Sequence, residues 1–331
     1  MISEVNFIEL MRKNQLFSPR QVNTCWQADC ELLRLDENKI LAVTTDGLSE
    51  ELETKLYEDP FHIGWMLVTI NASDLAAVAA TPLGILCNMT LVKTGKQAEI
   101  RYLEQLQAGI AKACTHYNLP LLGGDTNFAN HYQLSATALG LCEKPLTRVG
   151  AKPGDFICVS SYVGLGNLFA FNRLFLNKPA QFFPIAPLEF MHYVAPFATS
   201  CIDISDGVMD ALEMLAKINN VGIQLNNSKT YLHHQVIQAA NQHGFPAEVF
   251  LAGHHGDFEI LFTIPVESLE KFLAICKLND FCPLIIGNIS LKQGVTLANK
   301  NFPPNTFRSI WEQYSHDIEY YLKILLELFK P

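Results

Sequence analysis

Apolar residues alternate between two spacings in the first part of the chain. Runs of 8 to 11 residues rich in valine, isoleucine and leucine predict strands, at 39–47, 83–92, 119–127 and 132–142. We expect the first strand to end in a turn at Asp46-Gly47 and the third in a double-glycine turn at Gly123-Gly124. Apolar residues at helical spacing predict helices, a short one at the N-terminus and longer ones at 61–80 and 98–118.

Strand and helix continue to alternate after a proline- and glycine-rich segment at 144–155, the predicted domain boundary. Strands are predicted at 155–161, 201–205, 221–225, 258–265 and 283–290. Helices are predicted at 165–176, 207–220, 233–244, 266–278 and 318–330. We therefore expect an α/β and α+β protein of two domains, 1–145 and 146–331.

The helix "TINASDLAAVAATP", residues 69–82, carries Asp74 among small residues that suit close packing. A carboxylate in such a helix is costly unless it is capped, exposed to solvent or bound to a cation. A position facing solvent and a position at a site are both open from this segment alone.

Composition narrows the classes of function. The 331 residues are 49% hydrophobic and 17% charged, which predicts a sizeable core. The net charge of −9 argues against nucleic acid or an anionic membrane as partner, and such a protein would handle phosphates through metal ions. Nine scattered cysteines without C-x-x-C spacing, and no signal peptide or long apolar run, predict a cytoplasmic protein.

Several aspartates stand at predicted element ends, where a rigid scaffold can present them to a ligand. They are Asp29, Asp46, Asp74, Asp125, Asp203 and Asp206. Converging carboxylates repel one another unless divalent cations neutralise them, which suggests Mg²⁺ with a polyphosphate. Taken singly, the aspartates of "TDG" and "SDG" favour ordinary turn chemistry, and Asp74 alone is compatible with a helix position that faces solvent.

Other phosphate and nucleophile motifs are weak or missing. The sequence has no G-x-x-x-x-G-K-[ST] loop and no G-x-S-x-G elbow. Gly164 and Gly166 precede a predicted helix but lack the third glycine of a dinucleotide fingerprint, so they indicate a tight turn. The pairs His233-His234 and His254-His255 predict zinc only weakly, because adjacent side chains diverge.

Six motifs taken in order resemble the thiamine-monophosphate kinase family, within the superfamily of aminoimidazole ribonucleotide synthetase and selenophosphate synthetase. They are "TTDG", "IGWMLVTINASDLAAVAATPLG", "LLGGDTN", "LTRVGAKPGDFICVS", "CIDISDGVMDAL" and "GDFEILFTIP". The resemblance runs from about residue 20 to the C-terminus.

The resemblance implies an ATP site with Mg²⁺, a phosphorylated small acceptor and a homodimer whose N-terminal domains form a β-barrel. It implies catalytic roles for Asp46, Asp74 and Asp125. The implied metal ligands are Asp29, Thr44, Thr45, Asp46, Asp74, Asp125, Asp203 and Asp206. The implied ATP contacts are Gly124, Asp125, Arg148 and Ser205.

The acceptor site departs from the family pattern. The usual Gly-Asp-Asp is Gln27-Ala28-Asp29 here, and a substrate-contacting histidine aligns with Glu53. The family's Gly-Gly-Glu-Asp is His254-His255-Gly256-Asp257, so Gly256 stands where the family has a substrate-facing glutamate. A stacking aromatic ring is expected from Tyr314 or Trp311.

The leading hypothesis is therefore a Mg²⁺-dependent transfer of phosphate from ATP to thiamine phosphate. Two alternatives stay open on the sequence: a superfamily enzyme with a different acceptor, motivated by Glu53 and Gly256, and a non-catalytic nucleotide-binding relative, motivated by Ala28.

Overall fold

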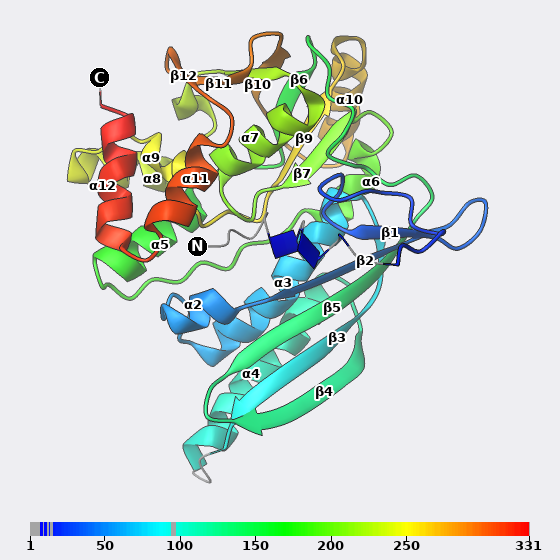
Figure 1. Cartoon of the computed structure of the whole chain (residues 1–331), viewed down its shortest axis with the longest axis vertical. Coiled ribbons are helices and arrows are strands. Elements are labelled where there is room, and N and C mark those ends of the chain that lie inside the picture. Colours follow the sequence, from blue (N-terminus) through cyan, green and yellow to red (C-terminus); the bar gives the residue numbers. More distant parts are fainter. Residues whose placement is uncertain (1–6, 9, 12, 14–15, 94–96, 331) are drawn as a thin grey trace.

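The computed structural model describes residues 7–8, 10–11, 13, 16–93 and 97–330, and they form two sheets with helices around them (Figure 1). The first sheet has the strand order β1-β2-β5-β3-β4. Its strands are β1 (Glu31–Arg34), β2 (Ile40–Gly47), β3 (Thr81–Val92), β4 (Leu121–Ala129) and β5 (Gln133–Cys142). All pairs are antiparallel except β3 with β4. The strand order places β1 and β4 at the two edges.

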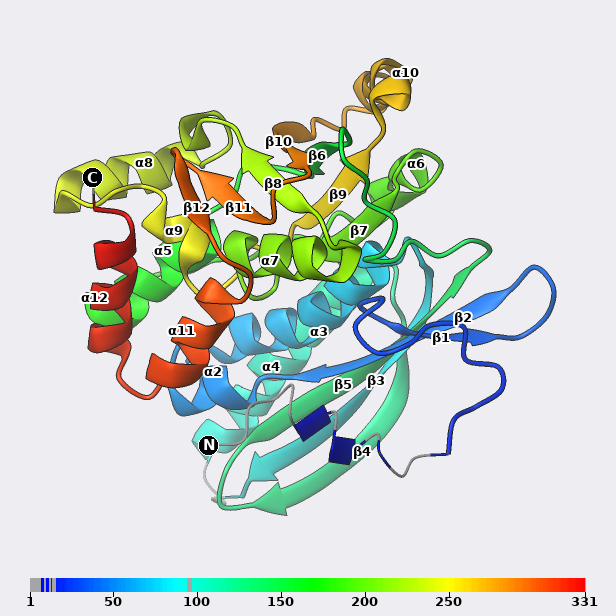
Figure 2. The ribbon, with the colours of Figure 1, turned by 45° about the horizontal axis from the view of Figure 1, so that its top comes forward.

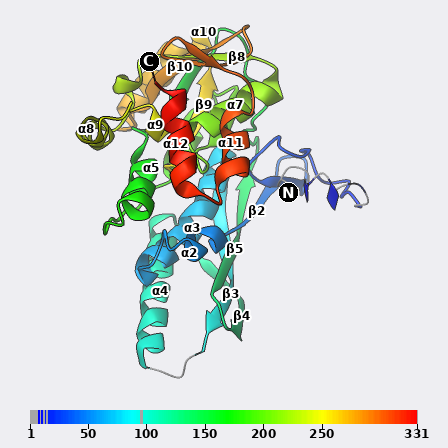
Figure 3. The same ribbon diagram turned by 60° about the vertical axis from the view of Figure 1, so that its left-hand side comes forward.

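Helices α3 (Pro60–Ala77) and α4 (Gln97–His116) cover one face of this sheet, as Figure 3 shows. Side chains that point to the helices are buried, such as Ala42, Ile85 and Ala138. The other face carries Val43, Leu86, Leu122 and Leu139, and it stays partly open: Leu86 is 38% and Leu122 55% exposed. An apolar sheet face without a covering layer marks an interaction surface.

Helix α3 is the centre of the molecule. Asp59 caps its N-terminus by accepting from the His62 amide at 2.8 Å, and Pro60 occupies its first turn. Fifteen of its eighteen residues are buried, because it packs on the first sheet, on α4 and on strand β7 of the second sheet. Its small residues allow those close approaches, and Asp74 lies at the junction of the two sheets.

The second sheet has the strand order β12-β11-β8-β10-β6-β9-β7. Its strands are β6 (Phe156–Val159), β7 (Ser200–Asp203), β8 (Gly222–Leu225), β9 (Ile260–Ile264), β10 (Leu284–Ser290), β11 (Gly294–Leu297) and β12 (Lys300–Phe302). Strand β11 pairs parallel with β8, and the other pairs are antiparallel. The mixed pattern agrees with the expected α/β and α+β class.

Helices surround this sheet. They are α5 (Leu165–Ala170), α6 (Met191–Val194), α7 (Val208–Asn219), α8 (His234–His243), α9 (Val249–Ala252), α10 (Val266–Leu278), α11 (Thr306–Tyr314) and α12 (Ile318–Leu328). A π-helical turn at Phe171–Phe175 extends α5, and short 3-10 turns occupy Leu188–Phe190 and Ser228–Thr230. Helix α11 contacts both α7 and α12, so the C-terminal helices return to the rim of the second sheet (Figure 2).

Two predicted turns are wrong. Strand β2 continues through Asp46 and Gly47, which pair with Ala136 and Ser135 of β5. Strand β4 likewise runs through Gly123 and Gly124, which pair with β3. At Gly124 a Cβ would lie 1.8 Å from the Cys87 carbonyl oxygen of β3. Glycine is therefore needed at this position because the two strands approach closely, and not because the chain turns.

Most other predicted elements are present, and several short ones were not predicted. Strands β1, β11 and β12 and helices α2 (Ser49–Glu53), α6, α9 and α11 lack a strong periodic signal. Residues 7–8 and 10–11 are helical, and the rest of the predicted N-terminal helix lies largely outside the described residues. The boundary at residue 145 stays a prediction.

Two further observations bear on the environment. All nine cysteines are free, and Cys282 is exposed while most of the others are buried. Within the part of the chain that the structure describes, every helix is too short or too polar to cross a bilayer.

The contact between α3 and α4 generates the first prediction. Gly109→Ala should lower the free energy of unfolding by about 2 kcal/mol, although alanine ordinarily favours helix, because its Cβ would lie 2.0 Å from the Phe61 carbonyl oxygen. Urea unfolding measures this. Gln107→Ala, at an exposed position of the same helix, is the control and should stay within about 0.5 kcal/mol of the parent. A stabilised Gly109→Ala protein would contradict the close packing.

Candidate active site

Three aspartates from three separate elements meet beside α3. Asp29 comes from the loop before β1, Asp74 from the last turns of α3, and Asp203 from the end of β7. One carboxylate oxygen of each lies within 4.8 Å of the others. The fold thus joins residues that are 45 and more positions apart in the chain.

Hydroxyl groups orient two of these carboxylates. The Thr44 hydroxyl of β2 donates to Asp74. The Ser73 hydroxyl, buried on α3, donates to Asp203 at 2.9 Å, and the Ser205 hydroxyl donates to the other Asp203 oxygen at 3.1 Å. Adjacent residues of one helix, Ser73 and Asp74, therefore fix the geometry between the two sheets.

Arg148 holds the third carboxylate. Its guanidinium donates to Asp29 Oδ1 at 2.7 Å, and its own amide donates to the Gln27 carbonyl at 2.7 Å. Among the described residues, the buried Asp29 Oδ2 and Arg148 Nε have no hydrogen-bond partner. A buried carboxylate oxygen without a donor is a ligand atom that can accept a cation.

Burial and mutual repulsion raise two carboxyl pKa values in this cluster. Burial raises the pKa of Asp74 well above its usual range, and Asp203 and Asp46 raise it further. Burial also raises the pKa of Asp203 well above its usual range, followed by the effect of Asp29. A divalent cation bound to these carboxylates would lower the pKa values of Asp74 and Asp203 again. Three oxygen donors suit a hard ion such as Mg²⁺.

Two cavities lie near the cluster, and Asp203 of the cluster lines the smaller one. The larger, of about 920 Å³, is lined by Asp46, Glu50, Glu51, His254, Arg308 and Trp311 among others. Burial raises the pKa of Glu51 to about 7, with smaller contributions from Asp46 and Glu50. The smaller, of about 160 Å³, includes Arg148, Asp203, Ser205, Asp206 and Arg308 in its wall. Serine 205, Asp206 and Arg308 belong to both walls.

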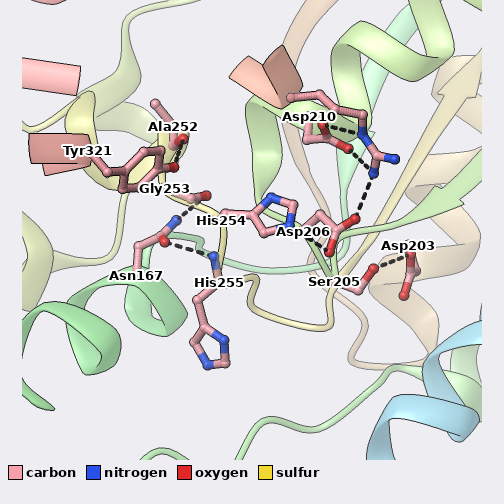
Figure 4. A network of polar contacts seen from close by, with 11 residues as sticks. Asn167, Asp203, Ser205, Asp206, Asp210, Ala252, Gly253, His254, His255 and Tyr321 are labelled. Carbon is pink, nitrogen blue, oxygen red and sulfur yellow. Dashed lines mark hydrogen bonds and ion pairs between the residues drawn. The ribbon is translucent and has the colours of Figure 1, made fainter. Parts of the chain in front are cut away.

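Asp206 lies in a network that the sequence did not indicate (Figure 4). Its carboxylate accepts from Arg308 at 2.9 Å, and His254 Nε2 lies 3.6 Å away. Arg308 also binds both oxygens of Asp210, each at 3.1 Å. His254 stacks on Trp311, with ring centroids 4.4 Å apart.

Asp125, predicted with the same metal set, lies elsewhere in the single chain. It pairs with Asn88 of β3, which pairs with Ser135 of β5, whereas Asp46 pairs with the neighbouring Ala136. Neighbouring residues of a strand point to opposite faces, so Asp125 points to the open face of the first sheet and Asp46 to the helix face. Thr45, next to Asp46, lies on the open face, and Gly124, next to Asp125, lies on the helix face; both are exposed.

The predicted acceptor residues are not brought together as the family pattern suggests. Glu53 is exposed and outside the residues that line the larger cavity, whereas Glu50 and Glu51 of the same helix line it. Tyr314 is half-buried against Tyr320 and is also outside that lining, whereas Trp311 is part of it. Of the two aromatic residues expected, Trp311 thus lines the cavity, and the roles of Glu53 and Tyr314 stay predictions.

Gly256 is packed too closely for any side chain. Its Cβ would lie 2.0 Å from the Ile204 carbonyl oxygen and 2.5 Å from that of Ser205, whose oxygen also accepts from the Gly256 amide at 2.8 Å. The adjacent Asp257 accepts from the amides of Gly164 and Gly166 at 2.8 and 2.9 Å. The two glycines therefore form the tight turn that was predicted.

The neighbouring His255 is an interior residue. Its Nε2 lies 3.0 Å from the hydroxyl oxygen of Tyr57, and burial lowers its pKa to about 3. Its amide donates to Asn167 Oδ1 at 3.1 Å, and Asn167 Nδ2 donates to the Gly253 carbonyl at 3.0 Å. These bonds fix the loop that carries His254 into the cavity wall.

Comparisons with known proteins agree with this geometry. Residues 27–142 match the family described as AIR synthase related protein, N-terminal domain. The thiamine-monophosphate kinase of Pyrococcus abyssi is 31% identical over 274 residues, which cover 81% of this chain and 83% of that protein. The chain belongs to the thiamine-monophosphate kinase family.

Other members and their structures give the same result. The thiamine-monophosphate kinase of Methanocaldococcus jannaschii is 28% identical over 284 residues, covering 79% of this chain and 86% of that one. A solved structure described as AaThiL complexed with AMPPCP and TMP has a TM-score of 0.73 at 22% identity, covering 92% of this chain and 96% of that one. This likeness confirms the expected mixed α/β fold of a single chain.

The carboxylate cluster generates the second prediction. Because the pKa of Asp74 is raised in the folded protein, protonated Asp74 stabilises the metal-free fold relative to the unfolded chain. The free energy of unfolding therefore falls as the pH rises above the ordinary aspartate pKa of 3.8. Asp74→Asn should therefore raise the free energy of unfolding of metal-free protein, by more at pH 8 than at pH 5. Urea unfolding at both pH values measures this.

The exposed Asp36→Asn is the matched control and should change stability little at either pH. Destabilisation of Asp74→Asn at pH 8 would mean that Asp74 is stabilised as a carboxylate without metal, contrary to the repulsion described.

Proposed function

We propose that this protein is a Mg²⁺-dependent kinase that transfers the γ-phosphoryl group of ATP to thiamine phosphate, giving thiamine diphosphate. The observation that carries the proposal is the cluster of Asp29, Asp74 and Asp203, with Asp203 in the wall of the smaller cavity, in a chain of the thiamine-monophosphate kinase family. The neighbour whose description names AMPPCP and TMP supports a nucleotide and a phosphorylated acceptor together. We expect the enzyme in the cytoplasm.

The proposed roles of the site residues follow from the chemistry of their side chains. Asp29, Asp74 and Asp203 would hold Mg²⁺, which supplies positive charge to phosphate oxygens that would otherwise be repelled. Arg148 faces the smaller cavity with Ser205, and both would bind ATP phosphates there. No covalent intermediate and no strong base is required, because the acceptor phosphate is already anionic.

The larger cavity suits the acceptor. Thiamine carries a positive thiazolium ring, and this cavity has carboxylates of Asp46, Glu50 and Glu51 in its wall together with the indole of Trp311. On this proposal Glu51 lies against the acceptor in place of Glu53, and the stacking ring expected from Tyr314 or Trp311 is that of Trp311. The altered His254-His255-Gly256 sequence then changes one wall of the pocket and leaves the other in place.

We further propose a homodimer built on the open face of the first sheet. The partly exposed Leu86 and Leu122 lie on that face with Asp125, so apolar burial would bring a second copy next to Asp125. A barrel formed by the two sheets would cover this face and complete the metal and nucleotide set across the interface. On that arrangement Thr45 and Asp125, which lie on the open face, would face the partner, and the role of Gly124 stays a separate prediction.

Activity is the third prediction. The purified protein with ATP, Mg²⁺ and thiamine phosphate should produce thiamine diphosphate, detected by chromatography, and Asp74→Asn should lower turnover at least 100-fold while remaining folded. Glu53→Gln should keep activity within about threefold, since Glu53 lies outside the cavity lining. ADP formation only with another phosphorylated acceptor would favour the different-acceptor alternative. Nucleotide binding without turnover would favour the non-catalytic one.

The interface is the fourth prediction. Light scattering after size exclusion should give the mass of a dimer, and Leu86→Glu should shift it toward monomer because it buries a charge in the sheet face. The control is Leu291→Glu, at an 86% exposed position after β10, and it should leave the dimer intact. A monomeric parent protein would contradict the proposed barrel.

A further inference from the structure

Asp206 belongs to the aspartates expected to bind metal, yet its surroundings are those of an ion pair. Arg308 donates to one Asp206 oxygen at 2.9 Å, and His254 lies 3.6 Å from the other (Figure 4). Arg308 is held in turn by Asp210, and its side chain is only 15% exposed. A guanidinium bound by two carboxylates from α7 and the loop before it is a fixed charge.

This arrangement fits a metal poorly at Asp206. A Mg²⁺ ion needs oxygen ligands at roughly 2.1 Å in an octahedral shell. Arg308 already donates to Asp206 Oδ2 and to both oxygens of Asp210. The described carboxylates that do approach one another closely enough for an ion, Asp29, Asp74 and Asp203, form a group without Asp206.

Arg308 also occupies a special position between the cavities. It lines both the small cavity, with Arg148 and Asp203, and the large one, with Trp311. If ATP phosphates lie in the first and the acceptor in the second, the group that crosses between them is the transferred phosphoryl group. A fixed cation at this boundary is placed to bind its oxygens.

We propose that Arg308 is a resident cation of the site: it replaces a divalent metal at Asp206 and binds the γ-phosphate of ATP at the boundary of the two cavities. This rests on the proposed kinase function for the identity of the nucleotide. Asp206 and Asp210 are then positioning residues for the guanidinium. His254 lies next to Asp206 and stacks on Trp311, which lines the proposed acceptor cavity.

Counting metal ions tests the first half without turnover. Mn²⁺ bound per chain is measured by electron paramagnetic resonance, in the presence of an ATP analogue with a methylene group between its β and γ phosphorus atoms. Asp206→Asn should bind as many Mn²⁺ ions as the parent protein, whereas Asp203→Asn should bind at least one fewer. Loss of one ion in Asp206→Asn would overturn the replacement of the metal.

Nucleotide affinity tests the second half. Arg308→Gln should weaken binding of the same analogue at least tenfold in calorimetry and binding of ADP less than threefold, since ADP lacks the γ-phosphate. Equal weakening for both nucleotides would indicate a structural effect and overturn the γ-phosphate contact. Arg308→Lys keeps the charge without the fork and should recover part of the lost affinity.

A double variant separates a phosphate contact from simple charge balance. Asp206→Asn with Arg308→Gln removes one negative and one positive charge, so the local charge is unchanged. The tenfold weakening should persist in this variant, and a return to parental affinity would overturn the contact. Arg173→Gln, which breaks an ion pair with Glu58 outside both cavity linings, is the control and should keep parental affinity.

These measurements need only the protein, Mn²⁺ and nucleotides. A protein that binds the analogue as expected and fails to phosphorylate thiamine phosphate would leave Arg308 as the γ-phosphate contact and reject the acceptor. If the parent protein phosphorylates thiamine phosphate but Arg308→Gln leaves both nucleotide affinities unchanged, the kinase function stands and the γ-phosphate contact of Arg308 is rejected.

Discussion

The proximity of three buried or half-buried carboxylates is the constraint on which the rest of this structure depends. Asp29, Asp74 and Asp203 repel one another and lose hydration, so the free energy of holding them together must come from elsewhere in the fold. Helix α3 supplies it through burial on nearly every side, against the first sheet, α4 and β7. The burial of the apolar residues of α3 therefore offsets the cost of placing its one acidic residue, Asp74, in the cluster.

The position of α3 also explains why the site lies between the sheets. Ser73 and Asp74 are adjacent on the helix, yet one binds Asp203 of the second sheet and the other accepts from Thr44 of the first. A relative movement of the sheets would break one of these bonds. Neutralisation of the carboxylates by a cation thus stabilises the contact between the sheets as well as the reactants.

The sequence predicted the parts of the fold that rest on local periodicity and the parts of the site that rest on ordered motifs. Long helices such as α4 and the aspartates of the cluster belong to these groups. Arg308 and its partners Asp206 and Asp210 were not predicted as a network, because about 100 residues separate them and an arginine in an amphipathic helix carries no motif. The Asp46-Gly47 and Gly123-Gly124 turns were mispredicted because extended glycines in paired strands look locally like turn residues.

The crowding at Gly256 has a consequence for how this chain can vary. Two carbonyl oxygens, of Ile204 and Ser205, occupy the space that a Cβ at residue 256 would need. A glutamate at residue 256 would therefore require the 253–258 loop to move away from the segment after β7. Residue 256 can therefore contribute only backbone atoms to this part of the protein, and any side-chain recognition near it must come from residues whose Cβ has room.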